Sequence, residues 1–182
     1  MDLHADFRTQ PNNIDAEQAV LGSMMLDKSV ISMVIQILTP DDFYDELHQG
    51  ICKTIYDLCN NNKVVDIITV SNKLPDIGLE YFMRLVDIPT TQNARHYAGI
   101  VKGKSIRRQI IKASEDIREM AFDGNYENII DLKNYAMQKL DIDVKDPQKT
   151  QTEIKHIGIK VLNSIEERYQ NKLDNKLPYG IS

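Results

Sequence analysis

Apolar residues recur at three- and four-residue steps along almost the whole chain, and this helical periodicity constrains the fold more than any other feature. The breaks between periodic segments carry residues that start or stop helices, such as Thr39-Pro40 and Asn60-Asn61-Asn62. Residues 67–74 are rich in β-branched side chains, which leaves a strand open as an alternative there. The pattern as a whole predicts an all-α fold.

Helix-capping residues divide residues 1–105 into short helices, which we expect to form a globular head. Asn12 or Asn13 can cap the first helix. The second follows Ser29, and its residues 30–38 are apolar nearly all round, which predicts a central, buried position. Thr39-Pro40-Asp41-Asp42 predicts a strong helix start, with a proline in the first turn and acids at the positive end of the helix dipole. The later helices are expected at residues 44–58, at 67–74 behind the cap Asp66, at 79–86 and from 92 onward.

Two amphipathic stretches flank the polar turn Asp123-Gly124-Asn125, which predicts a helical hairpin over residues 106–141. Two helices alone bury too little apolar surface to be stable. We therefore expect the hairpin to pack on another copy or another domain. The residues expected at a self-association surface are Ile106, Ile110, Ile117, Ile129, Leu132 and Leu140.

Residues 142–182 are expected to form a linker followed by a separate linker helix. Residues 141–152 are polar with one proline, which is linker composition. The helix beyond carries an apolar stripe that needs a docking groove. Its docking residues are Ile154, Val161, Ile165 and Tyr169. Because the sequence stops in mid-turn, we expect it to be part of a longer protein.

The net charge of −5 argues against a dedicated nucleic-acid clamp, which normally carries a basic excess, and favours a protein partner. One basic cluster remains, with no acid inside it: Lys102, Lys104, Arg107, Arg108 and Lys112. A helical DNA-binding domain that uses this cluster is the alternative function, although we prefer a solvated helix face.

The chain has neither a signal peptide nor an apolar run long enough for a membrane, so we expect a cytoplasmic protein, with Cys52 and Cys59 as free thiols.

No catalytic, cofactor or metal site is expected in this chain. Residues 98–105 fit a relaxed phosphate-loop pattern, but no strand precedes them, so a helix is preferred over an enzyme that would use Gly103-Lys104-Ser105. His48, Cys52 and Cys59 can share a helix face, yet a fourth zinc ligand is missing and buried packing is preferred. The acidic pairs Asp15 with Glu17 and Asp41 with Asp42 are interpreted as helix caps and dipole partners.

Partner-binding residues are more plausible than catalytic ones. Ile111 is an apolar residue among polar neighbours, on the helix face that also carries Arg107 and Arg118. This pattern fits a partner contact, and it fits an ordinary exposed apolar residue nearly as well. Phe122 and Tyr126 flank the hairpin turn, where an aromatic pair either binds a partner or stabilises the turn.

The segment Pro11-Asn-Asn-Ile-Asp-Ala-Glu-Gln-Ala-Val-Leu-Gly22 resembles the opening of DnaB-type replicative DNA helicases, bacterial or phage. Further matching motifs follow in the same order: residues 38–44, His48, Val65-Asp66, Thr69, Pro89-Thr90, Asn93, Tyr97-Ala98 and Ile100-Val101. The end of the chain resembles that family's linker helix, which precedes a RecA-like motor. Gly99 and Gly103 depart from the pattern, because they interrupt a segment that should be helical.

The resemblance implies a scaffold role for this chain in a homo-oligomer. It implies a ring of six subunits, with a collar built as a trimer of dimers through the hairpin. The parent enzyme would unwind duplex DNA at the replication fork with ATP and Mg²⁺ in its motor domain. Primase and a helicase loader are the implied protein partners, and DNA is contacted through the parent.

Overall fold

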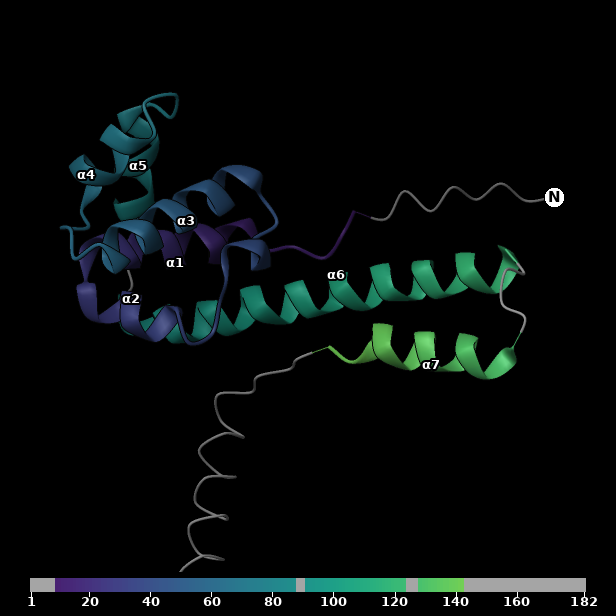
Figure 1. Ribbon diagram of the computed structural model, residues 1–182. Coiled ribbons are helices and arrows are strands. Elements are labelled where there is room, and N and C mark those ends of the chain that lie inside the picture. Colours follow the sequence, from purple (N-terminus) through teal and green to yellow (C-terminus); the bar gives the residue numbers. More distant parts are fainter. Residues whose placement is uncertain (1–8, 88–90, 124–127, 143–182) are drawn as a thin grey trace, which may run out of the picture. The chain divides into compact units, whose positions relative to one another are not determined.

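A computed structural model describes residues 9–87, 91–123 and 128–142 of the chain (Figure 1). These residues form helices joined by turns, with no strand among them, so the all-α prediction is confirmed. None of the described helices is both long and apolar enough to cross a membrane. The chain divides into two compact units, Met1–Asp143 and Val144–Ser182, and every described residue belongs to the first. The predicted linker-helix residues Ile154, Val161, Ile165 and Tyr169 lie outside the described residues.

Short helices build the head, and one long helix connects the head to the hairpin. The bounds are α1 Ile14–Leu26, α2 Lys28–Val34, the 3-10 turn η1 Pro40–Asp42, α3 Glu46–Asn60, α4 Ile67–Lys73, α5 Leu79–Asp87, the 3-10 turn η2 Thr91–Asn93, α6 Ala94–Asp123 and α7 Ile129–Leu140.

Two of the predicted caps are confirmed. The side chain of Asn13 accepts a hydrogen bond from the Ala16 N–H at 3.0 Å, at the start of α1. Asp66 accepts from the Thr69 N–H at 2.7 Å and starts α4. Each cap satisfies a backbone donor that has no partner inside its own helix. Residues 67–73 are therefore a helix, and the strand alternative is wrong.

The second helix differs from the prediction at both ends. α2 begins at Lys28 behind the cap Asp27, not behind Ser29, and its last residue is Val34. Ile35, beyond its end, is 41% exposed, so residues 30–38 are not buried all round. A helix of two turns has only one buried side, which here holds Val30, Ile31 and Val34.

The strong helix start at Thr39 leads to a single 3-10 turn and not to the long third helix. After η1 the backbone of Phe43 is extended, with φ −77° and ψ 146°, and α3 begins at Glu46 behind its own cap, Asp45. Phe43 is fully buried, and an extended residue at this point carries its ring into the core. Tyr44, predicted on the apolar face of the helix, lies outside α3 and is exposed.

The core of the head forms around α1, which packs against α2, α3, α5 and α6. Its apolar residues Val20, Leu21 and Met24 are completely buried. Gly22 sits where α1 crosses α5, and a Cβ atom placed there would overlap the carbonyl group of Leu85. A glycine lets the two helix backbones approach this closely, because any side chain would hold them apart.

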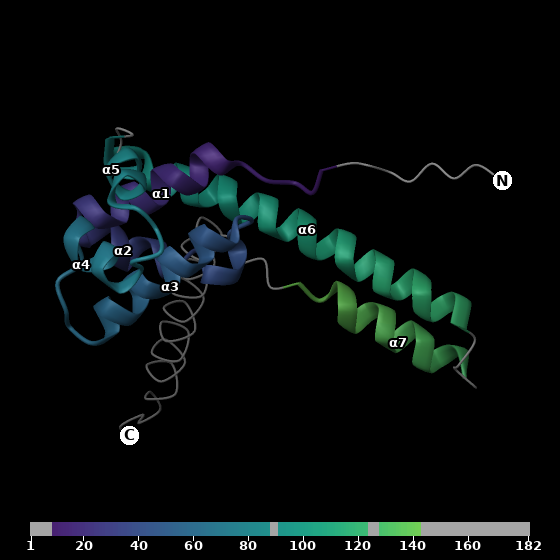
Figure 2. The same ribbon diagram turned by 90° about the horizontal axis from the view of Figure 1, so that it is seen from above.

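α6 is one continuous helix of 30 residues that begins in the head and continues into the hairpin. Its first part buries Ala94, Ala98 and Val101 in the core of the head. Its second part extends beyond the head, and α7 runs back along it (Figures 1 and 2). The predicted helical hairpin is confirmed.

Candidate interaction surface

Asp42 attaches α6 to the head. Its side chain is only 2% exposed. It accepts hydrogen bonds from the Thr39 N–H at 2.7 Å, from Lys102 Nζ at 2.9 and 3.0 Å, and from Ser105 Oγ at 2.7 Å. Burial alone would raise the pKa of this carboxyl group. The hydrogen bonds from Thr39 and Ser105 and the pairing with Lys102 outweigh burial, so its pKa is lowered from the ordinary value. The interpretation of Asp42 as a capping residue is confirmed by its capping box with Thr39, and the same carboxylate also bonds to α6, which the sequence did not predict.

Arg108 makes a second attachment one turn further along α6. Its guanidinium group donates to the carbonyl oxygens of Pro11 at 2.8 Å and Asp42 at 2.6 Å, and lies over the ring of Tyr44. Lys102 and Arg108 are therefore internal contacts, and for these two the interpretation as a solvated face is wrong. Asp42 neutralises the charge of Lys102, and Arg108 is held by two carbonyl groups of the head, so both are less available to phosphate groups of DNA.

Glu17 lies in the first turn of α1, as predicted, but its side chain is buried and makes contacts that the sequence did not predict. It is 1% exposed, and its carboxylate accepts from the Tyr44 N–H at 2.8 Å. Nδ1 of His48 lies 2.7 Å from Glu17 Oε2, and Nε2 of the same ring lies 2.7 Å from the hydroxyl of Tyr81. This buried polar cluster of Glu17, His48 and Tyr81 connects α1, α3 and α5. Glu17 is therefore a tertiary anchor as well as an acid of the first turn, whereas Asp15 in the same turn is exposed.

His48 and Cys52 are both buried, as the packing interpretation requires. Burial raises the pKa of the Cys52 thiol to about 12. Both ring nitrogens of His48 are already within hydrogen-bond distance of protein groups. In the described part of the chain, no three His, Cys, Asp or Glu side chains come together as a metal site would require. The segment of residues 98–105 lies inside α6, and its Ser105 bonds to Asp42.

The hairpin carries much of the exposed apolar surface in the part of the chain that the structure describes. Half of the large apolar side chains that are exposed lie on the second part of α6 and on α7: Ile110, Ile111, Phe122, Ile129, Ile130, Met137 and Leu140. Apolar surface gathered on one projecting element is typical of a protein interaction site. The second part of α6 and α7 are therefore the candidate interaction surface.

The six residues expected to self-associate divide into two groups. Ile129 is 75% exposed, Leu140 54% and Ile110 46%, so these three are available to a partner. Ile106, Ile117 and Leu132 are half-buried. Sequence periodicity missed Ile130 and Met137, which are exposed, because α7 carries apolar residues on more than one face.

One ion pair connects α7 to α6. Lys139 Nζ is 2.7 Å from Asp116 Oδ2 and also lies over the ring of Tyr135. The hydrogen bond from Lys139 lowers the pKa of Asp116, and the same bond raises the pKa of Lys139. The pair therefore joins the second part of α6 to the last turn of α7.

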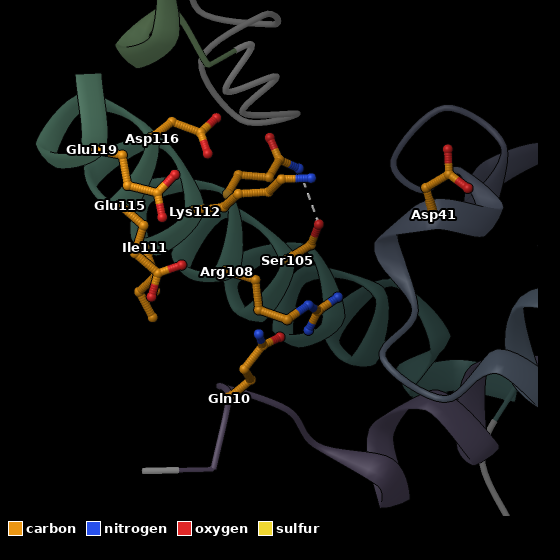
Figure 3. Close-up of a pocket in the computed structure, with 10 residues that line it drawn as sticks. Gln10, Asp41, Ser105, Arg108, Ile111, Lys112, Glu115, Asp116 and Glu119 are labelled. Atoms are coloured by element: carbon orange, nitrogen blue, oxygen red, sulfur yellow. Dashed lines mark hydrogen bonds between the residues drawn. The ribbon is translucent and has the colours of Figure 1, made fainter. Parts of the chain in front are cut away.

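Four of the five predicted partner-binding residues lie on α6, on the side away from α7. Arg107, Ile111 and Arg118 are exposed, and Phe122 is 85% exposed. Tyr126 lies outside the described residues. Ile111 borders an open groove of about 690 Å³ between α6 and the residues Gln10 and Asp41 of the head (Figure 3). The groove contains more acids than bases: Asp41, Glu115, Asp116 and Glu119 against Arg108 and Lys112.

Comparison with known proteins identifies relatives for most of the chain. A family model described as "DnaB-like helicase N terminal domain" matches residues 9–103. The chain is 32% identical to the replicative DNA helicase DnaC of Bacillus subtilis (strain 168), over 96% of this chain and 40% of that protein. It is 30% identical to the replicative DNA helicase DnaB of Geobacillus stearothermophilus, over 87% of this chain and 37% of that protein. The chain therefore spans about two fifths of the length of these relatives.

Two solved structures share the fold. The N-terminal domain of DnaB helicase from Mycobacterium tuberculosis superposes with a TM-score of 0.68 at 30% identity, covering 72% of this chain and 98% of that one. A DnaB-like replicative helicase, in a structure that describes its interactions with primase, superposes with a TM-score of 0.62 at 26% identity. That match covers 79% of this chain and 35% of the other.

Proposed function

The chain belongs to the family of DnaB-like helicase N-terminal domains, and from this premise we propose that it is the self-associating and partner-docking scaffold of a replicative DNA helicase. In this proposal the whole protein unwinds duplex DNA at the replication fork with ATP and Mg²⁺, in a motor domain distinct from this chain. Six subunits form the ring, and the hairpins pair them into a collar of three dimers. The single observation that carries the proposal is the exposed apolar surface of the hairpin.

The self-association part of the proposal depends on which apolar residues a neighbour can reach. Ile129 projects from the first turn of α7 and is 75% exposed, so covering it removes apolar surface from water. Ile117 is half-buried within one chain, and a charge there would disturb the hairpin itself. Ile129 is therefore the better probe of contact between chains.

We expect Ile129→Asp to weaken self-association at least about a hundredfold, because a carboxylate would lose its water inside an apolar contact. Sedimentation velocity over a range of concentrations measures this, with far-ultraviolet circular dichroism to show that the helices persist. Asn134→Asp is the matched control, since it adds the same charge at an exposed position of α7 and should assemble as wild type. Unchanged assembly of a folded Ile129→Asp protein would contradict the hairpin interface.

The partner-docking part of the proposal concerns primase, because a structurally similar helicase is described together with its interactions with primase. Ile111 is 39% exposed beside the groove of Figure 3, on the outer side of α6. A helicase loader is proposed as a second partner on family membership alone.

We expect Ile111→Asp to reduce the affinity for primase about tenfold or more, because an exposed apolar residue at a contact contributes through its buried area. Assembly should stay as in wild type, which separates this variant from Ile129→Asp. Titration calorimetry with the primase of the same organism measures the affinity, and Ser114→Asp, on the same exposed face, is the control for added charge. Equal affinities for wild type and Ile111→Asp would remove this residue from the docking site.

A further inference from the structure

Two glycines lie in the interior of α6 without a packing reason. Gly99 and Gly103 have ordinary helical backbones, and a Cβ atom added at either would meet nothing within 4 Å. Neither a close approach nor a left-handed conformation therefore requires glycine there. Each glycine lowers the local stability of the helix by about 1 kcal/mol relative to alanine. Residues 99–103 are thus the segment where α6 bends at the lowest cost.

This segment lies between two sets of contacts that α6 makes with the head. Ala94, Ala98 and Val101 hold the beginning of the helix in the apolar core. Beyond Val101 the contacts with the head become polar, and they come from one side of the helix, at Lys102, Ser105 and Arg108. We name these polar contacts the Asp42 brace, since all three residues bond to Asp42: Lys102 and Ser105 to its carboxylate, and Arg108 to its carbonyl oxygen.

The brace differs in kind from the apolar contacts before it. Apolar contacts tolerate small rotations, whereas hydrogen bonds of 2.6 to 3.0 Å depend strongly on direction and distance. A brace of this kind holds α6 at one angle as long as its bonds are made. Lys102 is 18% exposed, so water has access to this part of the brace.

We propose that residues 99–103 form a hinge between the head and the hairpin, and that the Asp42 brace holds this hinge in one position. Loss of the brace lets the hairpin change direction while the head remains folded. A change of direction would alter which neighbouring subunit the hairpin can contact. This consequence for assembly rests on the proposed function.

A distance between the head and the hairpin tests the hinge directly. Spin labels on cysteines introduced at Lys53 in α3 and Arg118 in α6, both exposed, report it by pulsed electron paramagnetic resonance. Cys59 is replaced by serine, whereas buried Cys52 stays, because its thiol is neither accessible nor ionised. The labelled chain is diluted with unlabelled chain, so that only distances within one molecule contribute. This readout is independent of self-association, which Ile129→Asp tests separately.

We expect one narrow distance distribution for the wild type and for Asp41→Asn, whose side chain is exposed. Asp42→Ala combined with Arg108→Met removes the carboxylate and the guanidinium group and therefore all three contacts of the brace. This double variant should broaden the distribution by roughly 6 Å, the displacement that a 15° swing gives at Arg118, about 25 Å along the helix from Val101. Adding Gly99→Ala and Gly103→Ala should narrow it again. Lys102→Met removes one contact of the brace, and it replaces the double variant if that protein does not fold.

Two results would overturn the proposal. One is a distribution as narrow as that of the wild type in a folded protein without the brace. The other is a broadening that the two alanines leave unchanged, because the bend would then lie outside residues 99–103. Circular dichroism and the cooperativity of urea unfolding show whether the head is intact in each variant.

Discussion

Replacing Gly22 with alanine should destabilise the head by about 3 kcal/mol or more, because the new methyl group would overlap the backbone of α5. A flexible side chain could move aside, but the obstacle here is the carbonyl group of Leu85, which is held within a helix. Relief requires α1 and α5 to separate. Separation would open gaps around Leu21 and Phe82, which are completely buried.

The matched control is Gly50→Ala in α3, where an added Cβ meets nothing within 4 Å. This substitution should raise the free energy of unfolding by about 0.5 to 1 kcal/mol, since alanine favours the helix. Urea unfolding of both variants, followed by circular dichroism, gives the two values. Equal effects at Gly22 and Gly50 would mean that helix propensity, and not the crossing of α1 and α5, decides the stability at Gly22.

Local chemistry predicted most of the helices of this chain correctly. Asn13 and Asp66 cap the helices that they were expected to cap, because the bond from a capping side chain to a backbone N–H spans only three residues. The same kind of signal failed at Thr39. Its turn is formed, but burial of Phe43 and the contacts of Asp42 with α6 end the helix after η1. These tertiary contacts outweighed the preference of residues 39–42 for starting a longer helix.

The apolar surface of the hairpin was predicted from the sequence. Which of its residues are half-buried and which are exposed was not. Periodicity placed Ile117 and Ile129 in one apolar set, although the first is half-buried and the second is largely exposed. That difference depends on where α7 lies on α6, and in this arrangement Lys139 contacts Asp116 across 23 residues of sequence. The brace joins Asp42 to Lys102 across 60 residues. A helical period gives no information at such separations.

The tertiary contacts of Glu17 could not be predicted from the sequence. Asp15 and Glu17 are both acids in the first turn of α1 and look equivalent as dipole partners. In the fold, Asp15 is exposed, whereas Glu17 is buried between the backbone of Tyr44 and the ring of His48. The two positions therefore form a natural pair for comparison.

Glu17→Ala should destabilise the head by about 3 to 5 kcal/mol, because the Tyr44 N–H and the buried ring of His48 would lose the carboxylate that they contact in the wild type. Asp15→Ala should cost less than about 1 kcal/mol, the usual value of an exposed acid near a helix start. Glu17→Gln, which keeps an acceptor for the Tyr44 N–H, should lie between them. Urea unfolding at neutral pH measures all three free energies. If Glu17→Ala and Asp15→Ala cost the same, the contacts of Glu17 with Tyr44 and His48 contribute nothing net, and α1 is held on α3 by apolar packing alone.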